Sequence, residues 1–286
     1  MTKRIAFVLY TKNDAEYLRD FLFSVLLKTI ESDLPECSFH YYFYENDSTD
    51  DTVSILREWQ VAHPERTTIM SETVPCASHG STTGRDYDRI ARMTTIRNRF
   101  LNKYRTELVS NYDYVWFLDS SIFTCAEDIA EMLKIIEGDR DIAMVTCNTL
   151  ETIENNKEVA ELYDAPPPSV VPFITTNHYY DTYAFLSIDN RSYYPNCTSP
   201  DCKYQRCREL QVRERGMAPI EVRSAWGGSV IIDAEVLKPK AVRWSTFAWS
   251  DSLAPCEHIY FCDMIRAFWG RKIVIAPNIK PLWIST

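Results

Sequence analysis

Two carboxylates follow an aromatic, apolar run in the segment YENDSTDDT, residues 44–52. The Ser and Asp residues later in this segment are typical caps for a helix starting at the next residues. Glu45 and Asp47 precede those caps, so capping does not explain them. Because open α/β folds bind ligands beyond the carboxyl ends of their strands, we interpret Glu45 and Asp47 as candidate ligand-binding residues.

A second acid ends an apolar run in the segment WFLDSSIF, residues 116–123. Asp119 is followed there by two hydroxyl residues, Ser120 and Ser121. One interpretation is that Asp119 caps a turn or the next helix. The strongly apolar run before it favours the other interpretation, in which Asp119 reaches a ligand at the edge of a sheet.

These acids need strands that end at one edge, and the apolar pattern predicts such a sheet. Continuous apolar runs with β-branched and aromatic residues indicate buried parallel strands. The expected strands are 5–10, 38–44, 67–72, 112–123, 142–149, 221–233 with a kink at Gly227-Gly228, and 272–277. The expected helices lie after Asn13 or Asp14 and at 51–62, 88–108, 127–138 and 256–270. Alternating strands and helices predict an α/β fold with a doubly wound, mostly parallel, Rossmann-like sheet flanked by helices.

The composition excludes several other classes of protein. With 45% hydrophobic and 25% charged residues the chain is an ordinary globular protein, and its net charge of −9 argues against nucleic acid as a partner. No apolar run approaches the roughly 20 residues of a membrane span, and the N-terminal apolar stretch is too short for a signal peptide. The sequence therefore predicts a cytoplasmic protein, or a soluble part of a longer one.

The small number of glycines and the surroundings of the cysteines give further information on the class of protein. The chain has 7 glycines and lacks both GxGxxG and GxxxxGK(S/T), which argues against a dinucleotide-binding dehydrogenase and a P-loop enzyme. Most of the nine cysteines lie in apolar or aromatic surroundings, which favours reduced core thiols.

The chain resembles the GT-A glycosyltransferases in the segments FVLYTKNDAEYL, YENDSTDDT, IRNRFLNKY and FLDSS. Within that group it is similar to the fungal capsule-associated mannosyltransferases and their viral and microbial relatives. The short motifs of those proteins stand here at residues 45–52, 97–101, 179–184, 227–231 and 256–258. The resemblance implies a glycosyltransferase that moves a hexose, with mannose as the implied sugar, from a GDP- or UDP-linked donor to a hydroxyl of a glycan or glycoconjugate.

The resemblance also implies one GT-A domain over residues 1–286, with different functions in its two halves. Residues 1–150 would bind the nucleotide sugar, and residues 151–286 would supply acceptor binding and catalysis. The base and ribose of the donor would be held by Tyr10, Thr11, Glu45 and Asp47. Arg97 would pair with the diphosphate, because a guanidinium fork matches phosphate oxygens, although a solvated helix face is an equal alternative. Arg89 and Arg92 are weaker candidates for that task.

A divalent cation is the cofactor that the resemblance implies. Asp119 stands where related transferases carry an Asp-x-Asp motif that holds a metal ion on the diphosphate. Hard oxygen ligands suit Mn²⁺ or Mg²⁺. Here Ser121 takes the place of the second acid, which puts the dependence on metal in question. His258 is the third candidate ligand.

Asp181 and a glycine pair are the candidates for sugar binding in the second half. Asp181 lies in the aromatic stretch 177–185, and aromatic faces beside a carboxylate suit a sugar ring. The alternative is an aromatic core loop with a surface acid. Gly227 and Gly228 would let the backbone approach the donor sugar, or they mark a β-bulge.

Glu257 and His258, with Asp181, are the expected catalytic residues. An inverting transferase needs a carboxylate that takes the proton of the acceptor hydroxyl, and a retaining one needs a carboxylate, or the substrate itself, beside the sugar ring. Glu257 fits either role, and His258 would ligate the metal or touch the diphosphate. The alternative is that Glu257 only begins a helix, where the dipole favours an acid.

Two other functions remain open on the sequence alone. One is a nucleotidyltransferase acting on a sugar phosphate, which usually opens with a Gly-rich basic loop, whereas this chain opens with FVLYTKND. The other is a non-catalytic glycan-binding module that has lost the second metal-binding acid. An Asp119→Ala variant that loses turnover but keeps its fold would identify an enzyme rather than a binding module.

Overall fold

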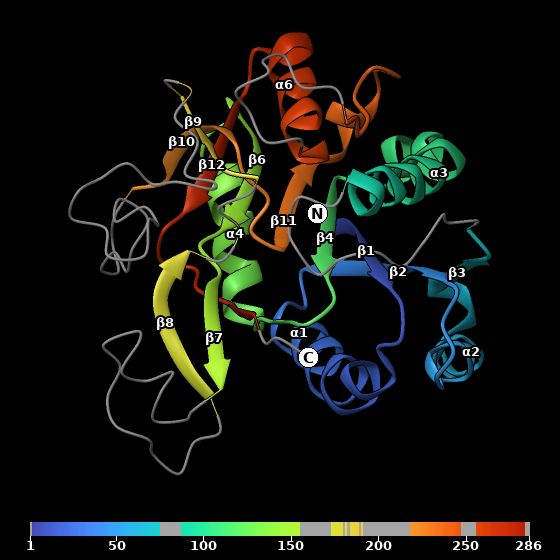
Figure 1. Ribbon diagram of the computed structural model, residues 1–286. Coiled ribbons are helices and arrows are strands. Elements are labelled where there is room, and N and C mark those ends of the chain that lie inside the picture. The colour runs from blue at the N-terminus through green and yellow to red at the C-terminus, as the bar shows by residue number, and fades with distance from the viewer. Residues whose placement is uncertain are drawn as a thin grey trace.

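The computed structural model describes residues 2–74, 87–154, 173–179, 181, 184–188, 190, 218–246 and 256–283. For residues 87, 88, 151–154 and 173–179 it describes the backbone only. The described residues form an α/β structure in which a large sheet runs through the middle and helices cover both of its faces (Figure 1).

Nine of the described strands form the large sheet, in the order β3-β2-β1-β4-β11-β6-β12-β10-β9. Their bounds are β1 Lys3–Thr11, β2 Cys37–Asn46, β3 Thr67–Glu72, β4 Tyr114–Asp119, β6 Ile142–Cys147, β9 Leu186–Ser187, β10 Ile220–Ser224, β11 Ser229–Asp233 and β12 Lys272–Ala276. The last seven residues of β1 are all buried, as expected for a strand covered on both faces. The expectation of a doubly wound, mostly parallel sheet is confirmed, because within the described sheet only β10 and β11 run against the common direction.

The predicted strand 221–233 is wrong as a single strand. It forms two strands: β10 lies between β12 and β9, whereas β11 lies between β4 and β6. The two strands separate at Gly227 and Gly228, whose φ angles are +66° and +74°. Such left-handed backbone favours glycine and lets the chain leave one position of the sheet and enter another.

The predicted strand 112–123 also divides, because β4 ends at Asp119 and the chain turns before β5. β5, Ile122–Phe123, belongs to a smaller sheet of the order β5-β13-β7-β8. Its other strands are β7 Leu150–Glu154, β8 Phe173–Tyr179 and β13 Leu282–Trp283. The break places Ser121 in a turn with a φ of +68°.

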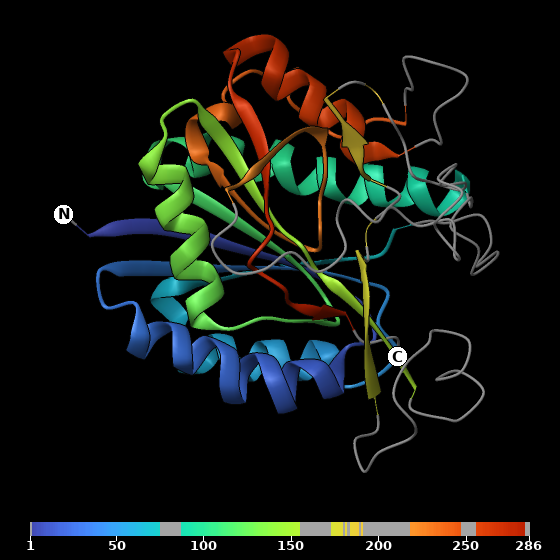
Figure 2. The same cartoon turned by 90° about the vertical axis from the view of Figure 1, so that its left-hand side faces the viewer.

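The helices lie in two layers, one on each face of the large sheet (Figures 1 and 2). Their bounds are α1 Leu27–Asp33, preceded by a π-helical stretch at Tyr17–Leu26, α2 Thr52–Ala62, α3 Tyr87–Asn111, α4 Ala126–Gly138 and α6 Glu257–Trp269. The helices α3 and α6 pack on one face, and α1, α2 and α4 on the other. The predicted helices at these places are therefore confirmed for the described residues.

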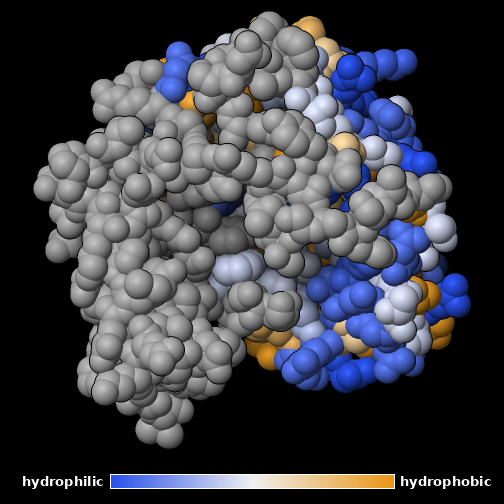
Figure 3. Space-filling view, viewed as in Figure 1, coloured by the Kyte–Doolittle hydropathy of each residue, from blue (hydrophilic) through white to orange (hydrophobic). Residues whose placement is uncertain are grey.

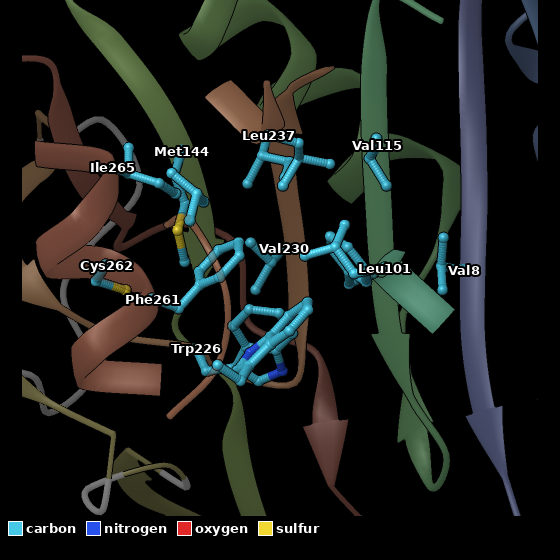
Figure 4. Close-up of a cluster of buried hydrophobic side chains, with 14 of the residues drawn as sticks. Val8, Leu101, Val115, Met144, Trp226, Val230, Leu237, Phe261, Cys262 and Ile265 are labelled. Atoms are coloured by element: carbon cyan, nitrogen blue, oxygen red, sulfur yellow. The ribbon is translucent and has the colours of Figure 1, made fainter. Parts of the chain in front are cut away.

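Each layer has its own apolar core. On the side of α3 and α6, Trp226 and Phe261 pack near Val230 of β11, and Leu101 of α3 lies beside Val115 and Val8 (Figure 4). The other core contains the rings of Phe7, Phe43 and Trp116. Because the strands alternate their side chains between the two faces, the sheet joins both cores.

The described part of the surface carries few large exposed hydrophobic residues. In the described part these are Val25, Val61, Ile188 and Phe268, which lie on different elements. The surface around α2 and α3 is mostly hydrophilic in the space-filling view (Figure 3). Among the described helices, none combines the length and the apolar character that crossing a membrane requires.

Candidate active site

Arg97 joins the strand end of β4 to the first turn of α6. Its Nη1 donates to the carboxylate of Glu257 and lies 2.9 Å from Nε2 of His258, and its Nη2 lies 3.4 Å from Oδ1 of Asp119. Arg97 is 4% exposed and comes from the middle of α3. The solvated helix face considered as an alternative for Arg97 is therefore excluded.

The charges around Arg97 keep it ionised. Burial by itself lowers the pKa of Arg97, but the carboxylates of Glu257 and Asp119 outweigh burial and raise the pKa above its ordinary value. The guanidinium also lies over two aromatic rings, 5.8 Å from the ring centre of Tyr10 and 5.5 Å from that of Trp226. These rings close the sides of the charge cluster and keep it poorly solvated.

Asp119 lies at the carboxyl end of β4, where its side chain is 27% exposed. Burial raises the pKa of Asp119, while Arg97 acts in the opposite direction. Its Oδ2 accepts a hydrogen bond of 3.1 Å from the indole N–H of Trp226, and its backbone N–H donates to the carbonyl of Gly228. The break between β10 and β11 thus brings Trp226 and Gly228 to the end of β4.

His258 is buried and surrounded by donors. Its ring stacks on Trp226 with centroids 4.1 Å apart, and burial, followed by the charge of Arg97, lowers its pKa well below the ordinary value. The imidazole is therefore neutral. Nδ1 lies 3.3 Å from the indole N–H of Trp244, while Nε2 faces Arg97. A neutral imidazole has one acceptor nitrogen, so it can accept only one of these two N–H groups.

Trp244 was not predicted as a site residue, and no local pattern marks it. It is 1% exposed, and its backbone is held by Asn98 of α3 through two hydrogen bonds. Two adjacent residues of α3 thus contact two parts of the site. Arg97 contacts the acids, and Asn98 binds the segment that carries Trp244. The sequence signal near this contact was Asn98, which directly follows Arg97. The sequence did not show that Asn98 binds the backbone of Trp244.

Asp181 holds the glycine turn. Its Oδ2 accepts the N–H of Gly227 at 2.9 Å, and its Oδ1 accepts the N–H of Ala184 at 3.2 Å. Burial raises the pKa of Asp181 to about 6, against the two backbone hydrogen bonds. The tyrosines Tyr180 and Tyr183 lie outside the described residues, as does the side chain of Tyr179.

Gly227 is required at its position for two reasons. It has a positive φ, and a Cβ on it would lie 2.5 Å from the carbonyl oxygen of Cys147 and from Oγ1 of Thr146. Gly227 therefore lets the backbone pass close to the end of β6. Thr146 and Thr149 donate to the carbonyls of Trp226 and Gly227, which fixes the turn beside Asp119.

Tyr10 and Thr11 end β1 beside this cluster. The ring of Tyr10 is buried under Arg97, and its hydroxyl has no hydrogen-bond partner in the described part of the chain. Burial raises the pKa of Tyr10, so the hydroxyl keeps its proton. The hydroxyl of Thr11 donates to Asp14 at 2.8 Å.

Glu45 and Asp47 lie at the same edge, at the end of β2, but their carboxylates are engaged. Glu45 accepts the backbone N–H of Ser48 at 2.8 Å and the hydroxyl of Ser71. Asp47 has a φ of +55° and accepts the backbone N–H of Val74 at 3.1 Å. Both carboxylates, which capping did not explain, thus bind groups in the turn after β2 and at the end of β3.

The donor chemistry at Asp119 fits a divalent cation. Its carboxylate is partly exposed, and its Oδ1 lies 3.4 Å from Nη2 of Arg97. Mg²⁺ and Mn²⁺ commonly bind through one or two carboxylates, water and substrate phosphates. Within the described ranges, no cluster of three or more His, Cys, Asp or Glu residues is arranged to hold a metal by protein ligands alone. Asp119 would therefore need the donor to complete the coordination.

The large sheet and the helices on its two faces are similar to the fold of a solved mannosyltransferase. The manganese- and GDP-mannose-bound mannosyltransferase PcManGT from Pyrobaculum calidifontis matches with a TM-score of 0.51 at 13% identity, over 99% of this chain and 57% of that one. S. aureus TarS matches with a TM-score of 0.47 at 11% identity, over 98% of this chain and 60% of that one. A TarS structure with UDP gives a TM-score of 0.46. The chain thus spans less than two thirds of these solved structures.

The family follows from the sequence itself. The model of the family described as cryptococcal mannosyltransferase 1 matches residues 4–263, and the chain belongs to that family. No curated protein sequence matches the chain. The resemblance to the capsule-associated mannosyltransferases and to the GT-A glycosyltransferases is therefore confirmed, and nucleotidyl transfer is not favoured.

Proposed function

We propose that this chain transfers a hexose, with mannose as the first choice, from a GDP- or UDP-linked donor to a hydroxyl of a glycan or glycoconjugate. The observation that carries the proposal is the contact of Arg97 with Asp119, Glu257 and His258 at the carboxyl ends of the strands. The family description supports mannose as the sugar. Open α/β folds bind their ligands at this edge.

We assign the diphosphate of the donor to Arg97. A guanidinium has five N–H groups, and the Nε of Arg97 is buried without a partner among the described residues. The ring of Tyr10 lies under the same guanidinium, and its hydroxyl also has no partner among the described residues. Tyr10 and Thr11, together with Glu45 and Asp47 at the end of β2, would contact the base and ribose.

A divalent cation, Mn²⁺ or Mg²⁺, would be held by Asp119, with Ser121 and His258 as the other candidate ligands. When bound, it would neutralise charge on the diphosphate and so favour its departure. His258 is neutral because its pKa is low, so one of its two ring nitrogens carries no proton and could bind the cation. Gly227 and Gly228 place the backbone next to Asp119.

The proposed reaction breaks the bond between C1 of the hexose and the phosphate oxygen, and the nucleoside diphosphate leaves with the electron pair. A new bond forms between C1 and the acceptor oxygen. Glu257 would receive the proton of the acceptor hydroxyl, and His258 would donate to or contact the phosphate. Asp181 holds the glycine turn and is assigned to the sugar side of the site.

The donor is tested by thermal unfolding with GDP, UDP, CDP and dTDP, each with and without Mn²⁺. We expect one of GDP and UDP to raise the melting temperature, and to do so more strongly with Mn²⁺. A ligand at about 100 Kd that binds only the folded state contributes about 2.7 kcal/mol. No shift with any nucleotide would remove the donor assignment of Arg97 and Tyr10.

Transfer itself is tested with the nucleotide sugar that matches the bound nucleotide. Asp119→Asn and Glu257→Gln should each lower the rate of sugar release at least about 100-fold while the nucleotide-free proteins still melt cooperatively. Equal rates in the variants and the wild type would contradict the catalytic assignment. Unchanged glycan binding without any turnover in the wild type would indicate a glycan-binding module instead.

A further inference from the structure

Arg97 occupies the point at which three ligand-type side chains meet. Its Nη1 contacts both the carboxylate of Glu257 and the imidazole of His258, which are themselves 3.6 Å apart, and its Nη2 contacts Asp119. Carboxylate oxygens and imidazole nitrogens are common ligands of divalent metals. The guanidinium therefore pairs with the candidate ligands themselves, and among the described residues no three of His, Cys, Asp or Glu are placed to share one metal ion.

The charges allow one cation here but disfavour a second. The charges of Asp119 and Glu257 are opposed by Arg97, and Arg89 is a further positive charge that acts on Asp119. A divalent cation added beside Arg97 would leave an excess of positive charge in a poorly solvated place, where like charges repel strongly. A diphosphate with about two negative charges would cancel the cation, so the two together leave the net charge of the cluster unchanged.

The contacts of Arg97 are also incomplete, which makes them easy to exchange. Its Nε has no partner among the described residues. Its contact with Nε2 of His258 competes with the N–H of Trp244 at Nδ1, because a neutral imidazole can accept only one of them. Phosphate oxygens would satisfy more of the guanidinium than the present partners do.

We propose that Arg97 is a built-in counterion that keeps free divalent cations out of the site until the donor diphosphate binds. This inference rests on the proposed donor site. In the donor-free protein the guanidinium pairs with Glu257 and Asp119. The incoming diphosphate draws the guanidinium toward its own oxygens, and Asp119 and His258 are then open to the cation. Arg97 therefore sets the order of binding, with the diphosphate no later than the metal.

The test measures the binding of Mn²⁺ alone, by the loss of the free-ion electron paramagnetic resonance signal. We expect the wild type to bind Mn²⁺ at least 10-fold more weakly without GDP or UDP than with it. Arg97→Met keeps much of the side-chain volume but removes the charge. It should bind Mn²⁺ without nucleotide at least 10-fold more tightly than the wild type does.

Two variants control the measurement. Arg99→Met removes a charge from the same helix, where Arg99 pairs with Glu72 on the surface, and it should not change Mn²⁺ binding. Arg97→Met combined with Asp119→Asn should lose the gained affinity. Unchanged Mn²⁺ affinity in Arg97→Met, or an equal gain in Arg99→Met, overturns the proposal.

The outcome remains decisive if Arg97→Met does not fold without metal. Folding on addition of Mn²⁺ but not of an equal ionic strength of NaCl supports the proposal. Failure to fold with either, together with no gain in Mn²⁺ affinity in the neutral variant Arg97→Gln, overturns it. Because these readouts need no turnover, a wild type that transfers no sugar would contradict the proposed function while leaving the behaviour of Arg97 measurable.

Discussion

Gly227 combines a positive φ with a crowded position at the end of β6. We expect Gly227→Ala to lower the free energy of unfolding by at least about 2 kcal/mol. Left-handed backbone costs an alanine about 1–2 kcal/mol, and a Cβ at 2.5 Å from two oxygens adds overpacking. Urea unfolding followed by tryptophan fluorescence measures the change.

Two other glycines separate these two causes. Gly270 has a φ of +63° but nothing within 4 Å of a Cβ, so Gly270→Ala should show the backbone cost alone, about 1–2 kcal/mol. Gly138 ends α4 with no positive φ and open space, and Gly138→Ala should be neutral or slightly stabilising. Equal losses at Gly227 and Gly270 would contradict the crowding.

Asp181 should make the stability of the protein fall as the pH rises from about 4 to about 6. Its pKa is raised from 3.8 to about 6 in the folded state, chiefly by burial. A carboxyl with a raised pKa stabilises the fold while protonated, and this contribution is lost as the pH passes the folded-state pKa. The effect is on the order of 2–3 kcal/mol.

The difference in unfolding free energy between the wild type and Asp181→Asn isolates this carboxyl. This difference should fall from pH 4 to pH 6 and then stay level to pH 8. All other titrating groups are common to the two proteins, so their effects cancel in the difference. A difference that is flat from pH 4 to pH 6 would show that Asp181 titrates normally. A rising difference would mean that the hydrogen bonds to Gly227 and Ala184 outweigh burial.

At the scale of elements, α3 positions the site by holding the segment that follows β11. Asn98 binds the backbone N–H and carbonyl of Trp244, and Arg105 donates to the carbonyls of Leu237, Pro239 and Val242. Trp244 in turn stacks on Phe261 of α6 and reaches His258. The helix therefore supports the candidate site through Asn98 and Arg105, which both follow Arg97 in the chain.

Asn98→Ala should lower the free energy of unfolding by about 1–3 kcal/mol, because it leaves two buried backbone groups of Trp244 without their partner. Sugar transfer should fall as well, since Trp244 loses its fixed position beside His258. Asn102→Ala, one turn further along the exposed face, is the control and should stay within about 0.5 kcal/mol of the wild type. Urea unfolding and initial rates give both readouts. A normal transfer rate in a destabilised Asn98→Ala would restrict Asn98 to stability.

At the scale of the whole molecule, the two expected halves share one sheet. β11 comes from the second half but lies between β4 and β6 of the first, and β12 pairs with β6. A sheet interleaved in this way cannot lose one half without exposing the edge and cores of the other. We therefore keep one domain over residues 1–286 as a prediction.

Unfolding should accordingly be a single cooperative transition. The urea midpoints from far-UV circular dichroism and from tryptophan fluorescence should agree, with one slope for both. Nucleotide binding should move the two midpoints together. Separate midpoints, with only one of them responding to nucleotide, would mean that residues 1–150 and 151–286 are independent units.

The local pattern of the sequence determined the elements and the residue types at their ends. Buried apolar runs predicted the strands, helical spacing predicted α2, α3, α4 and α6, and the acids after β2 and β4 predicted the edge that carries the site. The strand 221–233 was wrong because an apolar run does not specify its partner. A run that enters two places of a sheet looks the same as one long strand, apart from its glycine pair.

The tertiary structure alone decided which of these residues meet. Arg97 and Glu257 are 160 positions apart, and Trp244 carries no local signal. Their contact depends on the insertion of β11 beside β4 and on the packing of α3 and α6 on one face. Periodicity and caps arise from near neighbours in the chain, whereas strand order and helix packing arise from side chains far apart in it. The sequence therefore determined the candidates, and only the fold decided that Glu45 and Asp47 hold a turn while Arg97 holds the acids together.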